Sequence, residues 1–251
     1  MEPILSVEHL RRDYGGRGSV THAVDDVSFS VERGEFVGIM GASGSGKSTL
    51  LNCIATIDTP TAGHIRVEGQ DVTALKGRSL SRFRRERLGF VFQDCNLLDT
   101  LTAFENIALA LTIRGTPAGE IEGRVKETAE LLGITDCLNK YPYQMSGGQR
   151  QRTAAARAII TDPALVLADE PTGALDSRTG REVLSFLKQL NREGDTVVLI
   201  THDNSIAVRA DRIIRLQDGR IIYDGDAHDP RAVVQPDEPP EADIAEQEGA
   251  V

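Results

Sequence analysis

Four short runs of apolar residues have the pattern of strands that are buried on both faces of a parallel sheet. They lie at residues 36–40, 88–92, 165–168 and 197–200. A helical pattern opens at residues 48–52, and a further helix is expected over residues 150–160. These elements predict an α/β fold around a parallel sheet.

A different pattern, in which apolar and polar residues alternate, predicts strands with one exposed face. It covers residues 27–32, and residues 4–10 and 65–67 are of the same type, the last followed by a turn-like segment at residues 69–71. We therefore expect an N-terminal antiparallel β subdomain beside the parallel sheet. A terminal hairpin is also expected, because Asp218-Gly219 separates two apolar runs.

Between residues 102 and 138 the apolar positions follow the period of an α-helix and mark two helix faces. The first face contains Phe104, Ile107, Ala108 and Leu111, and the second contains Ile121, Val125, Ala129 and Leu132. These faces predict an α-helical subdomain inserted at about residues 94–160 of a domain that extends over residues 1–234.

The composition, with 40% hydrophobic and 26% charged residues, is ordinary for a soluble globular protein. Net charge is −10, and six acidic residues lie in residues 235–251, which contain no Lys or Arg and are expected to form a disordered tail. This charge does not indicate a nucleic-acid partner. The chain shows no signal-peptide pattern and no run near the roughly 18 apolar residues of a membrane span, and its three dispersed cysteines fit reduced thiols. We therefore expect a cytosolic protein.

Residues 41–49 match the phosphate-binding pattern G-x-x-x-x-G-K-[ST] at every fixed position, and they lie between an expected strand and an expected helix. The glycines let backbone N–H groups and the positive helix N-terminus approach an anion. Lys47 is placed to reach the β and γ phosphates of a nucleoside triphosphate, and Ser48 can offer its hydroxyl to Mg²⁺. A glycine-rich turn without a ligand is the alternative, which these flanking elements disfavour.

Further polar residues follow the ends of expected strands, where ligands collect in open α/β sheets. Asp169 and Glu170 are adjacent carboxylates, which predicts that the first holds Mg²⁺ and the second accepts a proton from water. Gln93 suits a contact with Mg²⁺ or water. His202 is compatible either with a contact to the γ-phosphate or with a satisfied core imidazole.

Three other features leave two interpretations open. Tyr14 either stacks on an adenine ring or covers the edge of a sheet. Residues 145–152 begin a helix with a serine and two glycines. This helix start is either an ordinary N-cap or an anion site for a phosphate that a second copy of the protein supplies. The basic residues 76–87 form either a solvated helix face or a surface for anionic lipid or an acidic partner.

In order along the chain, these motifs resemble those of the ATPase subunit of an ABC transporter over residues 4 to about 225. They are the phosphate loop, Gln93, the signature Met145-Ser146-Gly147-Gly148-Gln149, the pair Asp169-Glu170, the segment Ala174-Leu175-Asp176, and His202. The resemblance implies a P-loop NTPase with a RecA-like core. The implied nucleotide-binding residues are Tyr14, Gly41, Ser43, Gly44, Ser45, Gly46, Lys47, Ser48, Thr49 and Asp176, together with Ser146, Gly147, Gly148 and Gln149 of the signature.

The resemblance also implies a role for each catalytic residue, with ATP and Mg²⁺ as ligands. Glu170 activates the water, His202 supports the γ-phosphate, and Lys47 and Gln93 take part in catalysis. The implied metal-binding residues are Ser48, Gln93 and Asp169. Met145 stands where the family usually has Leu, a swap that conserves volume.

A finer resemblance connects residues 89–93, 101–106 and 168–177 with the subfamily of lipoprotein release, macrolide and antimicrobial-peptide export and bacterial cell division. The chain stops soon after the terminal hairpin, which argues against the sugar-importer type with its regulatory domain. We expect an ATPase that dimerises head to tail, with itself or a close homologue, around two ATP molecules. It would drive a separate membrane permease from the inner face of the cell membrane. The alternative is a soluble ABC ATPase of DNA repair or translation, disfavoured because each motif occurs once and no long heptad run is present.

Overall fold

The computed structural model describes residues 2–16, 19–92, 94–172 and 177–232. In chain order the main elements are β1 (Leu5–Gly16), β2 (Ser19–Val31), β3 (Phe36–Met40), α1 (Lys47–Ile54), β4 (Ala62–Val67), β5 (Gln70–Asp71), α2 (Gly77–Arg87), β6 (Leu88–Phe92), α3 (Ala103–Arg114), α4 (Ala118–Leu131), α5 (Gly147–Ile159), β7 (Leu165–Asp169), α6 (Ser177–Arg192), β8 (Val197–Ile200), α7 (Asn204–Ala207), β9 (Arg212–Gln217) and β10 (Arg220–Asp226). Short 3₁₀ helices lie at Thr135–Cys137, Pro142–Gln144 and Pro230–Ala232. The predictions for Gln93, for Asp176 and for a tail at residues 235–251 fall outside the described residues.

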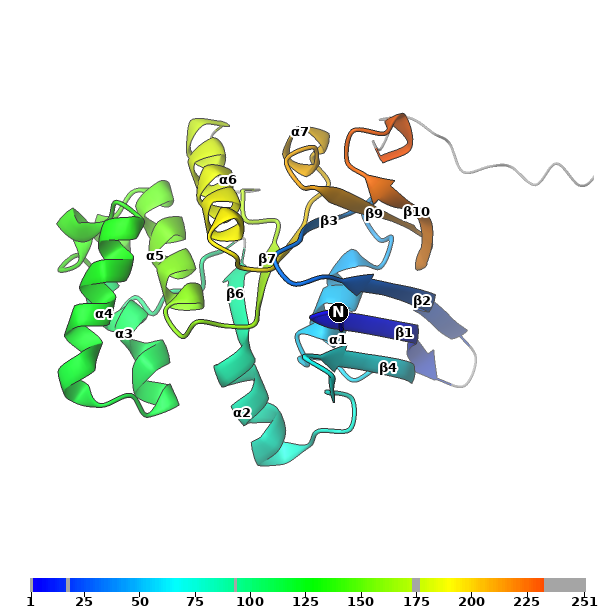
Figure 1. The fold of residues 1–251 in the computed structure, drawn as a ribbon, viewed down its shortest axis with the longest axis horizontal. Coiled ribbons are helices and arrows are strands. Elements are labelled where there is room, and N and C mark those ends of the chain that lie inside the picture. Colours follow the sequence, from blue (N-terminus) through cyan, green and yellow to red (C-terminus); the bar gives the residue numbers. More distant parts are fainter. Residues whose placement is uncertain (1, 17–18, 93, 173–176, 233–251) are drawn as a thin grey trace, which may run out of the picture.

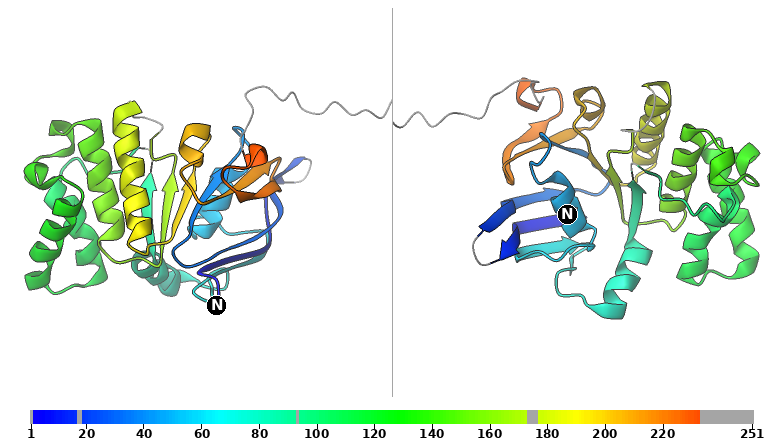
Figure 2. Two further views of the ribbon diagram at one scale, coloured as in Figure 1. Left: turned by 45° about the horizontal axis from the view of Figure 1, so that its top comes forward. Right: turned by 180° about the vertical axis from the view of Figure 1, so that it is seen from behind.

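The strands form two sheets. The smaller one has the order β2-β1-β4-β5 and is antiparallel, and the larger one has the order β10-β9-β3-β8-β7-β6. In the larger sheet all neighbours are parallel except β9 and β10, which form the expected terminal hairpin. The antiparallel strands lie at one end of the molecule and helices α3, α4 and α5 lie at the other, with the parallel strands between them (Figures 1 and 2). The predicted α/β architecture is therefore confirmed.

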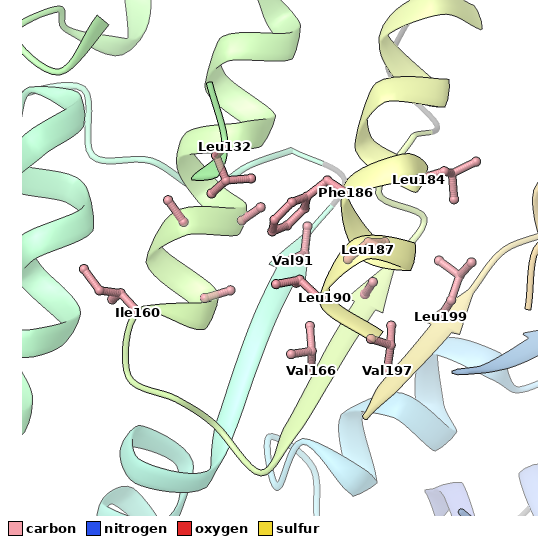
Figure 3. Packing of buried hydrophobic residues seen from close by; sticks show 14 of the residues in the cluster. Val91, Leu132, Ile160, Val166, Leu184, Phe186, Leu187, Leu190, Val197 and Leu199 are labelled. Atoms are coloured by element: carbon pink, nitrogen blue, oxygen red, sulfur yellow. The ribbon is translucent and has the colours of Figure 1, made fainter. Parts of the chain in front are cut away.

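The parallel strands are apolar throughout because successive residues face two different layers. In β8, Val197 and Leu199 pack in the cluster with α6, whereas Val198 and Ile200 pack in the cluster with α1 and the antiparallel sheet. Figure 3 shows the first of these layers, where Leu187 and Leu190 of α6 lie over the parallel strands, among side chains that include Val166 and Val197. The sheet is thus covered on both faces, and this packing fixes the positions of the strand ends from which the loops begin.

The helical part of the chain matches its two predicted apolar faces. Ile107 and Leu111 of α3 and Val125 and Ala129 of α4 are fully buried. Helix α3 begins with a capping box, in which Thr102 Oγ1 accepts a hydrogen bond from the Glu105 amide at 3.3 Å. No helix in the described parts of the chain is long and apolar enough to cross a membrane.

Several element boundaries differ from the prediction. Strands β1 and β2 extend beyond the predicted residues as a two-stranded ribbon. In this extension most side chains are exposed, so buried and exposed positions no longer alternate. The expected turn at residues 69–71 lies one residue earlier, because Glu68 and Gly69 take positive φ angles of 50° and 74°, and the two residues after Gly69 pair with β4 as strand β5. Helix α5 begins at its glycines rather than at residue 150. Helix α6 was not predicted, although its buried Val183, Leu184, Leu187 and Leu190 recur at the helical spacing.

Candidate functional site

The parallel order of β3, β8 and β7 brings the predicted site residues to one edge of the sheet. The glycine loop follows β3, Thr201 and His202 follow β8, and Glu170 follows β7. Because the three strands run in the same direction, the segments after their carboxyl ends are neighbours. Backbone hydrogen bonds also connect these strand ends. The Glu170 amide donates to the Ile200 carbonyl at 2.9 Å, and the Thr201 amide donates to the Ile39 carbonyl at 3.2 Å.

The glycine loop closes tightly between β3 and α1. Gly41 lies so close to β9 that a Cβ atom there would be 2.3 Å from the Leu216 carbonyl oxygen. Gly46, the residue before helix α1, has a φ angle of 99°, and a Cβ there would be 2.1 Å from the Ala23 carbonyl oxygen. These two positions therefore accept only glycine without a backbone shift. Ser43, Gly44 and Ser48 are exposed, as an external ligand requires.

Lys47 is the first residue of α1 and is 6% exposed. Its Nζ donates to the carbonyl oxygens of Gly41 and Ala42, both at 2.7 Å. Burial lowers the pKa of Lys47, and the negative charges of Glu170 and Asp169 partly offset this effect. The ammonium group is thus held inside the loop where phosphate oxygens can replace the two carbonyl acceptors.

The two carboxylates at the carboxyl end of β7, Asp169 within the strand and Glu170 after it, have different surroundings. Burial raises the pKa of Asp169, and the neighbouring Glu170 adds to this shift while Lys47 opposes it. Glu170 has a φ angle of 43°, a left-handed backbone conformation that is uncommon for a residue with a side chain. Its Oε1 lies 2.9 Å from Nδ1 of His202, and the His202 side chain is 63% exposed. The core-imidazole interpretation of His202 is therefore wrong.

Tyr14 lies in the exposed part of β1 and is 40% exposed. Its hydroxyl donates to Asp58 Oδ2 at 2.6 Å, and the Arg12 guanidinium lies over its ring at 4.5 Å from the centroid. Arg12 also donates to Asp58 at 2.9 Å, so the ring is held from two sides. The orientation of the ring is therefore fixed without a ligand, and stacking on adenine stays a prediction.

The signature segment opens helix α5, and its serine is a true N-cap. Ser146 Oγ accepts from the Gln149 amide at 3.2 Å, and the Gln149 side chain accepts from the Ser146 amide at 3.1 Å. This capping box positions Gly147 and Gly148 in the first turn, where backbone N–H groups have no partner within the helix. The capping interpretation is thus confirmed, and it leaves these amides suited to an anion.

One feature of the site was not predicted from the sequence. The approach of Ala23 and Leu216 to the loop involves residues distant along the chain, and no local pattern indicates it. The basic helix α2 buries only Phe83 and forms ion pairs such as Arg82–Glu86 and Arg87–Glu68, as expected for a solvated helix face.

The fold and this edge of the sheet define a P-loop nucleotide-binding ATPase. The sequence model of the family described as "ABC transporter" matches residues 24–173. The chain is 46% identical over 219 residues to the bacitracin export ATP-binding protein BceA of Halalkalibacterium halodurans, covering 87% of each chain. It superposes with a TM-score of 0.81 on the ATP-binding cassette MJ0796 bound to ADP and Pi, at 38% identity, covering 89% of this chain and 98% of the other. The chain belongs to the ABC transporter family and is its ATP-binding, ATP-hydrolysing cassette.

Other relatives are longer. The macrolide export ATP-binding/permease protein MacB of Aggregatibacter actinomycetemcomitans is 46% identical over 221 residues, which cover 88% of this chain and 34% of that protein. The chain therefore spans about a third of the length of this relative. Family membership favours transport over the alternative of DNA repair or translation.

Gly46→Ala should weaken ATP binding about tenfold or more, because the new Cβ meets the Ala23 carbonyl and the φ angle disfavours a side chain. The measurement is equilibrium ATP binding by calorimetry. Gly123→Ala is the matched control, since Gly123 lies in α4 with no atom within 4 Å of the added Cβ. Equal ATP affinity of Gly46→Ala and the parent protein would show that the tight contact is not needed.

Proposed function

We propose that this cassette binds ATP with Mg²⁺ at residues 41–49 and that Glu170 is the general base of hydrolysis. The observation that carries the proposal is the convergence of Lys47, Asp169, Glu170 and His202 after three adjacent parallel strands. Lys47 would exchange the carbonyl oxygens of Gly41 and Ala42 for phosphate oxygens. Its buried positive charge would then be matched by the anion rather than by two dipoles.

The Glu170–His202 contact would orient the base. A proton on His202 Nδ1 donates to Glu170 Oε1, which leaves the second carboxylate oxygen to accept a proton from the attacking water. The exposed imidazole keeps Nε2 accessible to the terminal phosphate. One contact thus serves two parts of the reaction, the direction of the carboxylate and the support of the phosphate.

The donor set fits Mg²⁺. This ion prefers hard oxygen ligands and is commonly bound by one or two carboxylates together with substrate phosphates. Burial raises the pKa of Asp169, and the neighbouring Glu170 adds to the shift, so a cation bound there would favour the ionised carboxylate. We propose that Asp169 and the exposed Ser48 hydroxyl hold the ion, with Gln93 as a further ligand. When bound, the ion neutralises charge on the phosphates.

The Ser146 helix start would complete the site of a second copy. Its capped first turn offers amides to an anion, while the phosphate loop belongs to a different part of the same chain. The solved cassette MJ0796 is described as dimeric, at 39% identity to this chain. We propose a head-to-tail dimer, of identical chains or close homologues, that encloses two ATP molecules.

We further propose that the dimer acts on an export permease from the cytoplasmic side of the membrane, in line with the named functions of BceA and MacB. An apolar groove of about 480 Å³ beside β6 would receive a permease segment. Its lining includes Phe90, Leu109 and Ile113, together with Arg84 and Arg85, so it suits an apolar segment with acidic residues. Because β6 ends one residue before Gln93, an occupant would lie next to the strand that leads to the site.

Glu170→Gln should keep ATP binding and lower turnover by about 10² or more, because an amide cannot accept the proton of the water. Steady-state hydrolysis and ATP affinity are measured on the purified variant. The control is Glu127→Gln, an exposed position on α4. Unchanged hydrolysis in Glu170→Gln would exclude it as the base, and lost ATP binding would indicate a structural role.

Mixing two inactive variants tests the shared site. Lys47→Ala removes the loop cation and Ser146→Arg blocks the helix start, so a mixed dimer has one site with both defects and one intact site. We expect mixing to restore part of the activity. Mixing Lys47→Ala with the double variant creates no intact site and should stay inactive. Activity of the parent protein that is independent of concentration, in a protein that sediments as a monomer, would contradict the dimer.

Ile113→Glu tests the groove, since Ile113 is 54% exposed there. After co-expression with a partner permease that copurifies with the parent protein, about tenfold less variant should copurify with the solubilised permease, because a carboxylate is costly to bury at an apolar contact. Ile222→Glu is the control at similar exposure, 49%, on β10. Equal recovery of both variants on the permease would refute this docking position.

A further inference from the structure

Three distant segments meet behind the phosphate loop. The Gly219 amide, in the turn between β9 and β10, donates to the Ser45 carbonyl at 3.1 Å. The Gly219 carbonyl in turn accepts from the Asp25 amide of β2 at 2.9 Å. The Ala23 carbonyl of β2 faces Gly46, whose missing Cβ would also lie 3.5 Å from Gly219 Cα. The loop is therefore supported from behind by β2 and by the terminal hairpin.

The contact to Ser45 sets the direction of the next amide. A trans peptide unit is planar, and its C=O and N–H groups point to opposite sides. When the Ser45 carbonyl is held toward the hairpin turn, the Gly46 N–H of the same peptide unit is directed away from it. That amide precedes the first turn of α1, where N–H groups have no partner within the helix. Gly219 thus orients an amide of the glycine loop toward the side on which an anion binds.

The conformation and the packing of the turn favour glycine at position 219. Asp218 and Gly219 have φ angles of 49° and 77°, and a Cβ on Gly219 would lie 3.1 Å from the Ala23 carbonyl oxygen and 3.2 Å from that of His22. The left-handed turn and the close approach to β2 both disfavour a side chain.

An ion pair holds the turn against β2. Arg220 directs Nη2 and Nε to Asp25 Oδ2 at 2.6 and 3.0 Å. Asp25 therefore binds the turn twice, through its backbone amide to Gly219 and through its carboxylate to Arg220. Both bonds act on adjacent residues of the turn and fix its position relative to the loop.

We infer that Gly219, held in place by the Asp25–Arg220 ion pair, is a positioning residue for the phosphate-binding amide of Gly46. The inference rests on the proposed binding of ATP at this loop. It predicts that a break in the support weakens ATP binding and leaves the chemical groups of hydrolysis, such as Glu170 and His202, in place.

The test compares KM and kcat for ATP in the full chain. Arg220→Gln should raise KM about fivefold, in the range of a partly exposed ion pair, and leave kcat within about twofold. Gly219→Ala should raise KM about tenfold or more. Exchange of the charges in Asp25→Arg/Arg220→Asp should restore KM to near that of the parent protein. The thermal midpoint without nucleotide is recorded for each variant.

Arg33→Gln is the matched control. The Arg33 side chain pairs with Glu68 at 2.9 Å and is 66% exposed, close to the 69% of the Arg220 side chain. It should leave KM unchanged. An unchanged KM in Arg220→Gln and Gly219→Ala would overturn the inference. A fall in both kcat and the thermal midpoint that the charge exchange does not restore would also overturn it, because it would indicate general destabilisation. If Gly219→Ala does not fold, Arg220→Gln and the charge exchange decide the question. A parent protein that fails to bind ATP would instead refute the proposed function.

Discussion

The geometry of the site depends on the parallel pairing of β3, β8 and β7. Each strand ends at the same edge of the sheet. Residues that are far apart along the chain, such as Lys47, Glu170 and His202, therefore come together because of the strand order and not because of their local sequence. The pairing is maintained by burial on both faces, because the strands supply apolar side chains alternately to two hydrophobic clusters. A polar residue within these strands would disturb the core and the site together.

Electrostatics explains why the site is prepared for an anion. Lys47 is desolvated, which lowers its pKa, and its ammonium group is satisfied by two carbonyl dipoles rather than by a full negative charge. On the other side, burial and the neighbouring Glu170 raise the pKa of Asp169. Burial is the largest cause of both pKa shifts, and the attraction between Lys47 and Asp169 opposes it only in part. A polyphosphate together with a divalent cation would compensate both charges at once.

The sequence predicted those parts of the fold and site that are encoded locally. The phosphate loop, the carboxylates after β7 and the apolar helix faces each lie within a short segment whose pattern has one physical cause. The support behind the loop was not predictable, because it joins Ala23, Ser45 and Gly219 and depends on backbone groups that any residue carries. His202 required the structure for a different reason. Its neighbour Glu170 follows a different strand, β7, and only the strand order makes the two residues adjacent.

The phosphate loop and the Ser146 helix start, which are the two halves of the proposed shared site, differ in their local contacts. The loop presents a cation and a glycine-rich backbone, whereas the Ser146 helix start presents capped first-turn amides and no basic side chain from its own cap. Two reciprocal hydrogen bonds between Ser146 and Gln149 hold this first turn. In the proposed dimer, a turn that its cap already holds would lose little further conformational entropy on binding a phosphate. The phosphate loop differs in being supported from behind, because the Gly219 amide donates to the Ser45 carbonyl and the Gly219 carbonyl accepts from the Asp25 amide of β2.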